Sequence, residues 1–127
     1  DMDKLKTIND TLGLDVGDEV IRATTSVLKE VLGGEGLLCR LGGDEFVSFL
    51  PLGMALDMQS VVENVQSATD AFNATHDVAY QMSISVGGVE FVVDGQTRER
   101  ISELMVEADT RLYEMKRRRK QSRRYAS

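Results

Sequence analysis

Two adjacent glycines and two adjacent carboxylates interrupt an apolar stretch of the chain, and they constrain its fold more than any other feature. The sequence Gly-Gly-Asp-Glu at residues 42–45 lies between the apolar runs 37–41 and 46–50. Adjacent glycines let a backbone adopt positive φ and approach a ligand closely. Adjacent acids at a tight turn concentrate negative charge, which favours binding of a cation. We therefore expect a β-hairpin whose tip carries chemistry.

The composition predicts a single soluble domain. The chain has 127 residues, of which 42% are hydrophobic and 28% are charged, and these are ordinary values for globular proteins. A chain of this length buries roughly two-thirds of the surface that its unfolded form exposes, so one core is expected. No apolar run approaches the roughly 18 residues that a membrane span needs. The sequence starts with Asp1 rather than Met, so we expect a piece of a longer protein.

The single cysteine, Cys39, lies inside the apolar run 37–41. One cysteine cannot form an internal disulfide or a thiolate cluster, which favours a small buried apolar residue over a reactive one. A lone cysteine also fits a reducing compartment, so we expect a cytoplasmic protein or the cytoplasmic part of a membrane-bound one.

The net charge of -6 is unevenly distributed. Residues 1–112 contain 8 Lys and Arg against 20 Asp and Glu, whereas residues 113–127 contain 7 basic residues and one acid. The acidic body argues against a nucleic-acid partner. The basic end, a tail or linker over 117–127, suits contacts with phosphates or an anionic membrane. It equally suits a solvated helix end whose cations match the helix dipole.

Hydrophobic spacing predicts four helices and four strands. Residues 80–86 alternate most cleanly and predict the clearest strand of the chain. The order of the elements indicates an α+β fold, with a mostly antiparallel sheet covered by helices. The expected helices cover residues 5–13, 16–32, 56–72 and 100–115 and beyond, and the expected strands cover 37–41, 46–50, 80–86 and 89–93.

Asp15 and Asp18 stand at the spacing of a helix N-cap and its third helical residue. This spacing is typical of a capping box, in which the second carboxylate bonds back to the start of the helix. From the residues alone, this structural role is the favoured one for Asp18.

Five short motifs follow one another along nearly the whole chain. A lone Gly-Gly-Asp-Glu would be compatible with any hairpin, but the ordered set is far more specific. Together the motifs resemble the GGDEF family of diguanylate cyclases. They are Asp1-Met2-Asp3 with Lys6; Ile8-Asn9-Asp10 with Gly13 and Gly17-Asp18; Arg40-Leu41-Gly42-Gly43-Asp44-Glu45-Phe46; Ser83-Ile84-Ser85-Val86-Gly87; and Ala108-Asp109 with Leu112-Tyr113 and Lys116.

The resemblance implies a ferredoxin-like fold, similar to the catalytic domains of nucleotide cyclases and polymerase palms. Residues 1–127 are then one GGDEF domain whose first strand, expected before Asp1, is missing. The implied activity is condensation of two GTP molecules into cyclic di-GMP. Each 3′-hydroxyl attacks the α-phosphorus held by the other copy, so the resemblance also implies a homodimer.

The resemblance further implies two Mg²⁺ ions in each active site, with Mn²⁺ as a substitute. Asp1 and Asp44 would bind them together with the Met2 carbonyl, and Glu45 would join these ligands or orient the site. Carboxylate and carbonyl oxygens are the ligands that Mg²⁺ prefers. Asp44 is also the implied catalytic residue that helps to deprotonate the 3′-hydroxyl, with Glu45 beside it.

The implied substrate contacts divide between the base and the phosphates. Asn9 and Asp18 match the positions that read guanine, which changes the favoured role of Asp18. A carboxylate can accept hydrogen bonds from both N1–H and the 2-amino group of guanine, and adenine offers no such pair. The cations that would contact the phosphates are Lys6, Lys116 and Lys120. Gly42 and Gly43 would let the backbone of the hairpin pass close to the nucleotide, where a Cβ would clash.

The sequence departs from the family pattern at several positions. Leu5 and Leu14 replace a usual phenylalanine and histidine. After Lys116, the usual Gly-Arg-Asn is replaced by Arg-Lys-Gln at residues 119–121. Without the glycine the last helix loses its usual stop, so we expect it to run on. Lys120 keeps a cation where the family has arginine, but it cannot form a bidentate phosphate contact.

Another departure concerns product inhibition. Many family members carry Arg-x-x-Asp shortly before the hairpin, where the product binds, and the matching positions here are Gly33 and Gly36. The sequence therefore predicts no product inhibition at this place.

Two other functional classes compete with the enzyme. The first is a module that binds GTP without turnover and regulates an attached sensor or EAL-type phosphodiesterase domain. The second is a structural dimerisation domain. The intact tip acids, Asp44 and Glu45, favour the enzyme, whereas the altered C-terminal motif and the missing strand favour the module. A test for cyclic di-GMP separates them.

Overall fold

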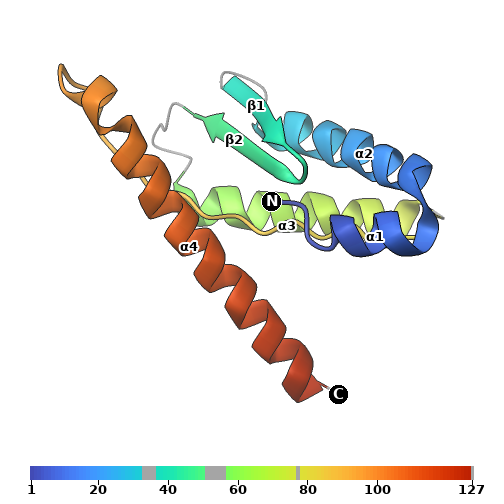
Figure 1. The fold of residues 1–127 in the computed structure, drawn as a ribbon. Helices are drawn as coiled ribbons and strands as arrows, with labels where there is room; N and C mark the ends of the chain where they lie inside the picture. The colour runs from blue at the N-terminus through green and yellow to red at the C-terminus, as the bar shows by residue number, and fades with distance from the viewer. Residues whose placement is uncertain (33–36, 51–56, 77, 127) are drawn as a thin grey trace. The chain divides into compact units, whose positions relative to one another are not determined.

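The computed structural model describes residues 1–32, 37–50, 57–76 and 78–126, with side chains up to Arg119. The described chain forms two compact units, Asp1–Ile84 and Ser85–Ser127. The first unit contains α1, α2, the hairpin β1–β2 and α3, and the second contains α4 (Figure 1). The elements are α1 (Leu5–Leu12), α2 (Leu14–Leu32), β1 (Leu37–Gly42), β2 (Glu45–Phe49), α3 (Met58–Thr75) and α4 (Thr97–Ala126).

The helical hairpin α1–α2 turns at Gly13. This glycine has φ 94°, a value that side chains disfavour, and it ends α1 as predicted. Helix α2 begins at Leu14, two residues earlier than expected. Asp15 is therefore a residue of the first turn and not the N-cap, so the predicted capping box with Asp18 is wrong.

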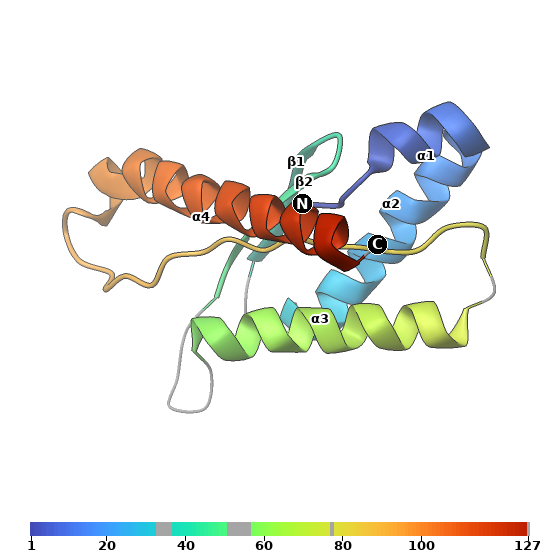
Figure 2. The same cartoon turned by 90° about the horizontal axis from the view of Figure 1, so that it is seen from below.

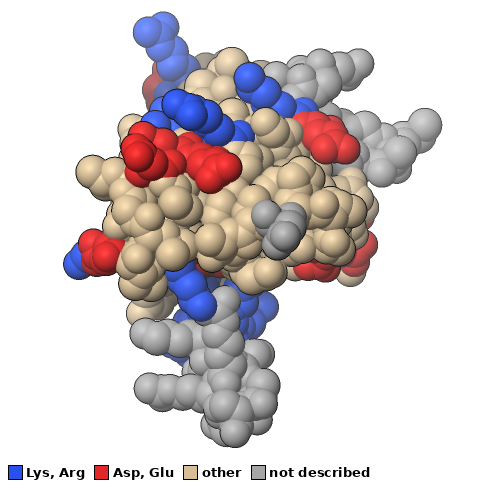
Figure 3. Space-filling model, turned by 90° about the vertical axis from the view of Figure 1, so that its right-hand side faces the viewer, with Lys and Arg blue, Asp and Glu red and all other residues tan. Residues whose placement is uncertain are grey.

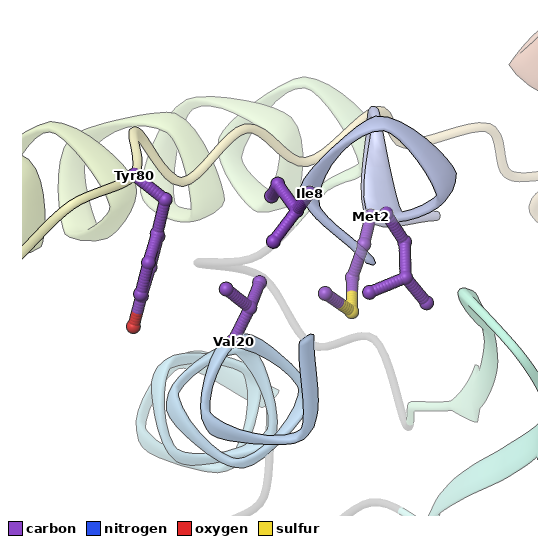
Figure 4. Packing of buried hydrophobic residues seen from close by; sticks show 5 residues of the cluster. Met2, Ile8, Val20 and Tyr80 are labelled. Carbon is purple, nitrogen blue, oxygen red and sulfur yellow. The ribbon is translucent and has the colours of Figure 1, made fainter. Parts of the chain in front are cut away.

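The core of the first unit joins the N-terminal motif to both helices. Its buried residues come from the start of the chain, from α1 and α2, and from the extended segment after α3, and Figure 4 shows them converging. Burial of each such side chain contributes about 1.5–3 kcal/mol. The partly buried Phe46 packs against this cluster and so attaches the hairpin to it. The buried members are Met2, Leu5, Ile8, Val20 and Tyr80.

Tyr80 makes this core sensitive to high pH. Burial raises the pKa of Tyr80, and the charge of Glu19 raises it further. Because the folded state holds the phenol proton more tightly, this contribution to stability is complete below the ordinary tyrosine pKa of about 10 and is lost as the pH rises above it. We expect the melting temperature of the wild type to fall more steeply above about pH 10 than that of Tyr80→Phe. Parallel pH profiles would contradict this.

The hairpin forms as the sequence predicts. Strands β1 and β2 are antiparallel, with Leu37 opposite Phe49 and Gly42 opposite Glu45. Cys39, however, is exposed, so the prediction that it is buried is wrong. All residues of β1 except the partly buried Leu38 are exposed, so a place in this strand does not bring Cys39 into the core.

The segment 80–86 is not a strand, although the sequence predicts its clearest strand there. Its alternation does describe burial, because Tyr80, Met82 and Ile84 are buried. The pairing observed in the described chain is one isolated antiparallel bridge, between Met2 and Ile84. The side-chain amide of Asn73 on α3 bonds both the N–H and the C=O of Met82, each at 2.8 Å. A side chain thus takes the place of a neighbouring strand.

The strand predicted over residues 89–93 is also absent from the described structure. Val92 and Val93 are 82% and 77% exposed. Packing against other described residues therefore does not explain why these two residues are apolar. The α+β class and the antiparallel pairing are confirmed, but the observed sheet has two strands.

Helix α3 has an unambiguous start. The Asp57 carboxylate accepts a 2.8 Å hydrogen bond from the N–H of Ser60, and this bond holds the pKa of Asp57 below its usual value. The helix then runs to Thr75, whereas the sequence predicts residues 56–72.

In the second unit, the extended segment 85–88 lies along α4 (Figure 2). The Val86 N–H donates to Met115 Sδ at 3.1 Å, and Arg111 Nη1 donates to the Gly88 carbonyl at 2.6 Å. Helix α4 continues past Lys116 to Ala126, which confirms the expectation drawn from the absent glycine.

The surface carries charges of both signs. On the face drawn in Figure 3, acidic and basic side chains are interspersed. Among the described helices, none combines the length and the apolar character that crossing a bilayer requires.

Candidate active site

The hairpin tip has the backbone geometry that its glycines allow. Gly42 has φ 148° and Gly43 has φ 49°, both in the region that disfavours side chains. Arg40 fixes the turn, because its Nε and Nη2 donate to the Gly43 carbonyl at 3.1 and 2.9 Å. An added Cβ on either glycine would meet nothing within 4 Å. The backbone of the tip is therefore open to an approaching ligand.

The left-handed geometry of Gly43 predicts a graded response to substitution. Gly43→Ala should cost about 1–2 kcal/mol of folding free energy, because a Cβ is strained in this conformation, and Gly43→Asn should cost less, because asparagine tolerates it. Urea unfolding of the two variants measures both costs. Equal losses, or no loss with alanine, would contradict the turn geometry.

A backbone hydrogen bond joins the N-terminal motif to this tip. The Met2 N–H donates to the Asp44 carbonyl at 2.9 Å, and the Asp3 N–H donates to the Ser83 carbonyl at 2.8 Å. The Met2 side chain is 1% exposed and anchors the motif in the core. Asp1, 43 positions before Asp44 in the sequence, is thereby held beside the tip.

The donor atoms of the residues near this bond are of the kinds that Mg²⁺ prefers. The N–H and C=O of one extended residue point to the same side of a strand, so we expect the Met2 carbonyl to face the hairpin as its N–H does. Asp1, Asp44 and Glu45 are all partly buried. Among the described residues, no group of three or more His, Cys, Asp or Glu side chains is arranged to hold a metal ion. Two carboxylates with a carbonyl nevertheless fit Mg²⁺, which keeps several waters.

The first turn of α1 lies next in the chain. Lys4 precedes the helix with φ 65° and makes no side-chain cap bond within the described structure. The first backbone N–H groups of a helix that lacks such a cap can bind anions, and the helix dipole favours this. Lys6 is exposed on this turn, so a cation and open N–H groups occur next to the acidic motif.

Asn9 lies against Gly17, the residue that precedes Asp18, where α1 and α2 meet. The Asn9 side chain lies so close to Gly17 that a Cβ there would collide with Asn9 Oδ1. Asp18 follows Gly17 and is exposed, whereas Asn9 is half-buried. Helix α1 rises by about 6 Å between Leu5 and Asn9. The two groups of predicted site residues therefore lie toward opposite ends of one short helix.

The two other predicted phosphate contacts, Lys116 and Lys120, belong to the C-terminal part of the chain. Lys116 is partly buried on α4, in the second unit, and the side chain of Lys120 lies outside the described part of the chain. Positions 33 and 36, on which the prediction about product inhibition rests, also lie outside the described residues.

Two residues acquire roles that the sequence did not suggest. Arg40 belongs to the hairpin motif, but its bonds to the Gly43 carbonyl become evident only in the folded turn. Gly17 belongs to a family motif, but the sequence indicated no role for it. In the fold it leaves the space that the Asn9 side chain occupies. A glycine inside a helical pattern often allows close packing of a neighbouring group. Its position within the expected helix was therefore the one indication of this role in the sequence.

Comparisons with known proteins identify the family of the chain. The model of the family described as "Diguanylate cyclase, GGDEF domain" matches residues 1–122. Over 119 residues, or 91% of the chain, the chain is 32% identical to the probable diguanylate cyclase DgcF of Escherichia coli strain K12 and 33% identical to the response regulator PleD of Caulobacter vibrioides.

A third relative is the bifunctional diguanylate cyclase/cyclic di-GMP phosphodiesterase MucR of Pseudomonas aeruginosa, which is 30% identical over 118 residues. The chain spans only 38%, 26% and 16% of the lengths of DgcF, PleD and MucR, respectively. Because the family match extends over nearly the whole sequence and includes both the N-terminal acids and the hairpin tip, the chain belongs to the GGDEF family of diguanylate cyclases.

Proposed function

We propose that this chain is a diguanylate cyclase domain, which condenses two GTP molecules into cyclic di-GMP. The observation that carries this proposal is the hydrogen bond from Met2 to Asp44, which holds the N-terminal acids beside the Gly-Gly-Asp-Glu tip. The family match over residues 1–122 supports it, as does the similarity to DgcF and MucR, which are named as a probable and a bifunctional diguanylate cyclase.

Guanine would bind where α1 meets α2. The Asp18 carboxylate would accept hydrogen bonds from N1–H and the 2-amino group, and the Asn9 amide would complete the contact. An unpaired buried polar group costs about 1–3 kcal/mol, so a base without this pattern would bind more weakly.

The triphosphate would extend from this end of α1 toward the hairpin. Lys6 and the open N–H groups of the first turn of α1 would contact it. The backbone at Gly42 and Gly43 would approach it where no Cβ intervenes. Lys116, and Lys120 after it, would supply further cations.

Asp1, Asp44, the Met2 carbonyl and Glu45 would hold the divalent metal ions. When bound, Mg²⁺, or Mn²⁺ in its place, supplies charge neutralisation on the triphosphate. Asp44 would accept the proton of the attacking 3′-hydroxyl, and Glu45 would orient the ligands beside it.

The reaction requires two copies of the domain, each holding one GTP. In each half-reaction a 3′-oxygen forms a bond to the α-phosphorus of the other nucleotide, and the bond from that phosphorus to the pyrophosphate oxygen breaks. Two pyrophosphates leave and two protons are released. The working form would therefore be a homodimer, and a GTP-consuming domain of this kind would act in the cytoplasm.

One observation favours a second function, a module that binds GTP and regulates an attached domain. Helix α4 continues without interruption to Ala126, through the positions where the family usually has Gly-Arg-Asn. This departure weakens the phosphate contacts expected there.

Incubation of the full-length parent protein and of this chain with GTP and Mg²⁺ separates the two functions. Chromatography should detect cyclic di-GMP, and the rate per protein should rise with protein concentration, as a homodimer requires. Binding of GTP without product would establish the module. Absence of both would refute both functions.

A further inference from the structure

Gly17 lies where a side chain would collide with a predicted guanine-reading residue. It is buried in the first turns of α2, and an added Cβ would strike Asn9 Oδ1 and lie 2.8 Å from Asn9 Cγ and 3.6 Å from Asn9 Nδ2. All three of these atoms belong to the amide group of Asn9. The space that a side chain at position 17 would need is thus occupied by this amide.

The backbone prevents the two residues from separating. The Asn9 carbonyl accepts a hydrogen bond from the Gly13 N–H, and the Gly13 carbonyl accepts one from the Gly17 N–H, each at 3.1 Å. Beside this chain of bonds, Ile8 of α1 and Val20 of α2 belong to the same buried cluster. Moving the helices apart would break these bonds and open the core, so a larger residue at position 17 would displace the Asn9 side chain instead.

No other requirement for glycine is found at this position. The described glycines with positive φ are Gly13, Gly42 and Gly43, so the backbone of Gly17 suits any residue. Glycine within a helix is less favourable than alanine. Glycine at this position thus goes against the preference of a helix for alanine, and such exceptions are expected at functional sites.

We infer that Gly17 is a positioning residue for base selection: by lacking a side chain, it lets the Asn9 amide lie beside Asp18 and face the base. This inference rests on the proposed function, in which these two residues read guanine. Among the described residues, none hydrogen-bonds to the Asn9 amide, which leaves its polar atoms available to a ligand. Gly17 itself would touch no substrate.

The consequence is a loss of selectivity rather than of all binding. Gly17→Ala should weaken GTP binding by roughly 10-fold or more, since the hydrogen bonds of the Asn9 amide to guanine are lost. Binding of ATP and of inorganic tripolyphosphate should change little, because the first turn of α1 and the hairpin tip are untouched.

The test is a double-mutant cycle on the full chain, with Gly17→Ala, Asn9→Ala and the double variant. Calorimetric titration with GTP, ATP and tripolyphosphate, each with Mg²⁺, gives the affinities, and thermal unfolding gives the stabilities. We expect each single variant to lose the preference for GTP and the double variant to lose no more than Asn9→Ala alone. In the Asn9→Ala background, Gly17→Ala should raise the melting temperature, because the collision is gone and alanine favours the helix.

The outcomes distinguish this inference from the proposed function. If the wild type shows no preference for GTP over ATP, the guanine-reading role and the proposed function fail together. If the wild type prefers GTP and Gly17→Ala keeps that preference, only the role of Gly17 is refuted. If Gly17→Ala alone fails to fold and the double variant folds, the collision with Asn9 is supported directly.

Discussion

Asp44→Asn is expected to abolish cyclic di-GMP synthesis while the protein stays folded. Asparagine has nearly the same shape, and the Asp44 carbonyl that accepts the Met2 N–H belongs to the backbone and is retained. The substitution removes the charge of a proposed metal ligand and the proposed proton acceptor. Mutation of a residue that hydrogen-bonds to a metal ligand already lowers metal affinity or activity by about 10- to 100-fold. For the loss of the ligand itself we expect the rate to fall by more than about 100-fold.

The control for this variant is Asp70→Asn, which removes an exposed carboxylate on α3 that accepts a hydrogen bond from Gln66. Product formation from GTP and Mg²⁺ is measured for both variants beside the wild type, and circular dichroism checks the fold. Asp70→Asn should retain the wild-type rate. Equal rates in a folded Asp44→Asn protein would remove the hairpin tip from the catalytic site.

Gly87→Ala is expected to destabilise the second unit by about 2–3 kcal/mol, through overpacking against main chain. A Cβ on Gly87 would collide with the Ala108 carbonyl and the Leu112 N–H and lie 2.6 Å from Leu112 Cα. Helix backbone cannot move aside as a flexible side chain can. The bonds from Val86 to Met115 and from Arg111 to Gly88 also hold the segment on both sides of this glycine.

The matched control is Gly95→Ala, because Gly95 has no heavy atom within 4 Å of the added Cβ and is exposed. Urea unfolding should show a large loss for Gly87→Ala and a change within about 0.5 kcal/mol for Gly95→Ala, as is usual for surface substitutions. Similar losses in both variants would contradict the packing of Gly87 on α4.

The sequence predicted correctly those parts of the fold that depend on neighbouring residues alone. The hairpin follows from two glycines between apolar runs, and both glycines do adopt positive φ. Helix α1 ends at Gly13 as expected. The start of α2 was misplaced because Asp15 reads as an N-cap in sequence, whereas the turn at Gly13 lets the helix begin at Leu14.

Hydrophobic patterns gave wrong predictions where pairing or burial depends on residues far away in the sequence. Alternation over residues 80–86 predicted the burial of Tyr80, Met82 and Ile84 but not their pairing, since a strand needs a neighbour and Asn73 bonds Met82 in its place. The mostly apolar residues 37–41 also predicted burial, but all residues of β1 except Leu38 are exposed, so the buried position expected for Cys39 is wrong.

The candidate site was predictable mainly through the family resemblance. No local pattern relates Asp1 to Asp44, which the fold joins through Met2. The proximity of Asn9 and Gly17 likewise requires the turn between α1 and α2, so the role of Gly17 emerges only in three dimensions.

The central claim is that the N-terminal acids and the hairpin tip form one metal and nucleotide site. Titration of the ¹⁵N-labelled chain with Mn²⁺ in the presence of GTP tests it most directly, because a paramagnetic ion broadens the amide signals around its site. We predict that the signals of Met2, Asp44 and Glu45 broaden first, while those near Asp70 on α3 persist. Broadening centred elsewhere, with Met2 and Asp44 unaffected, would contradict the site.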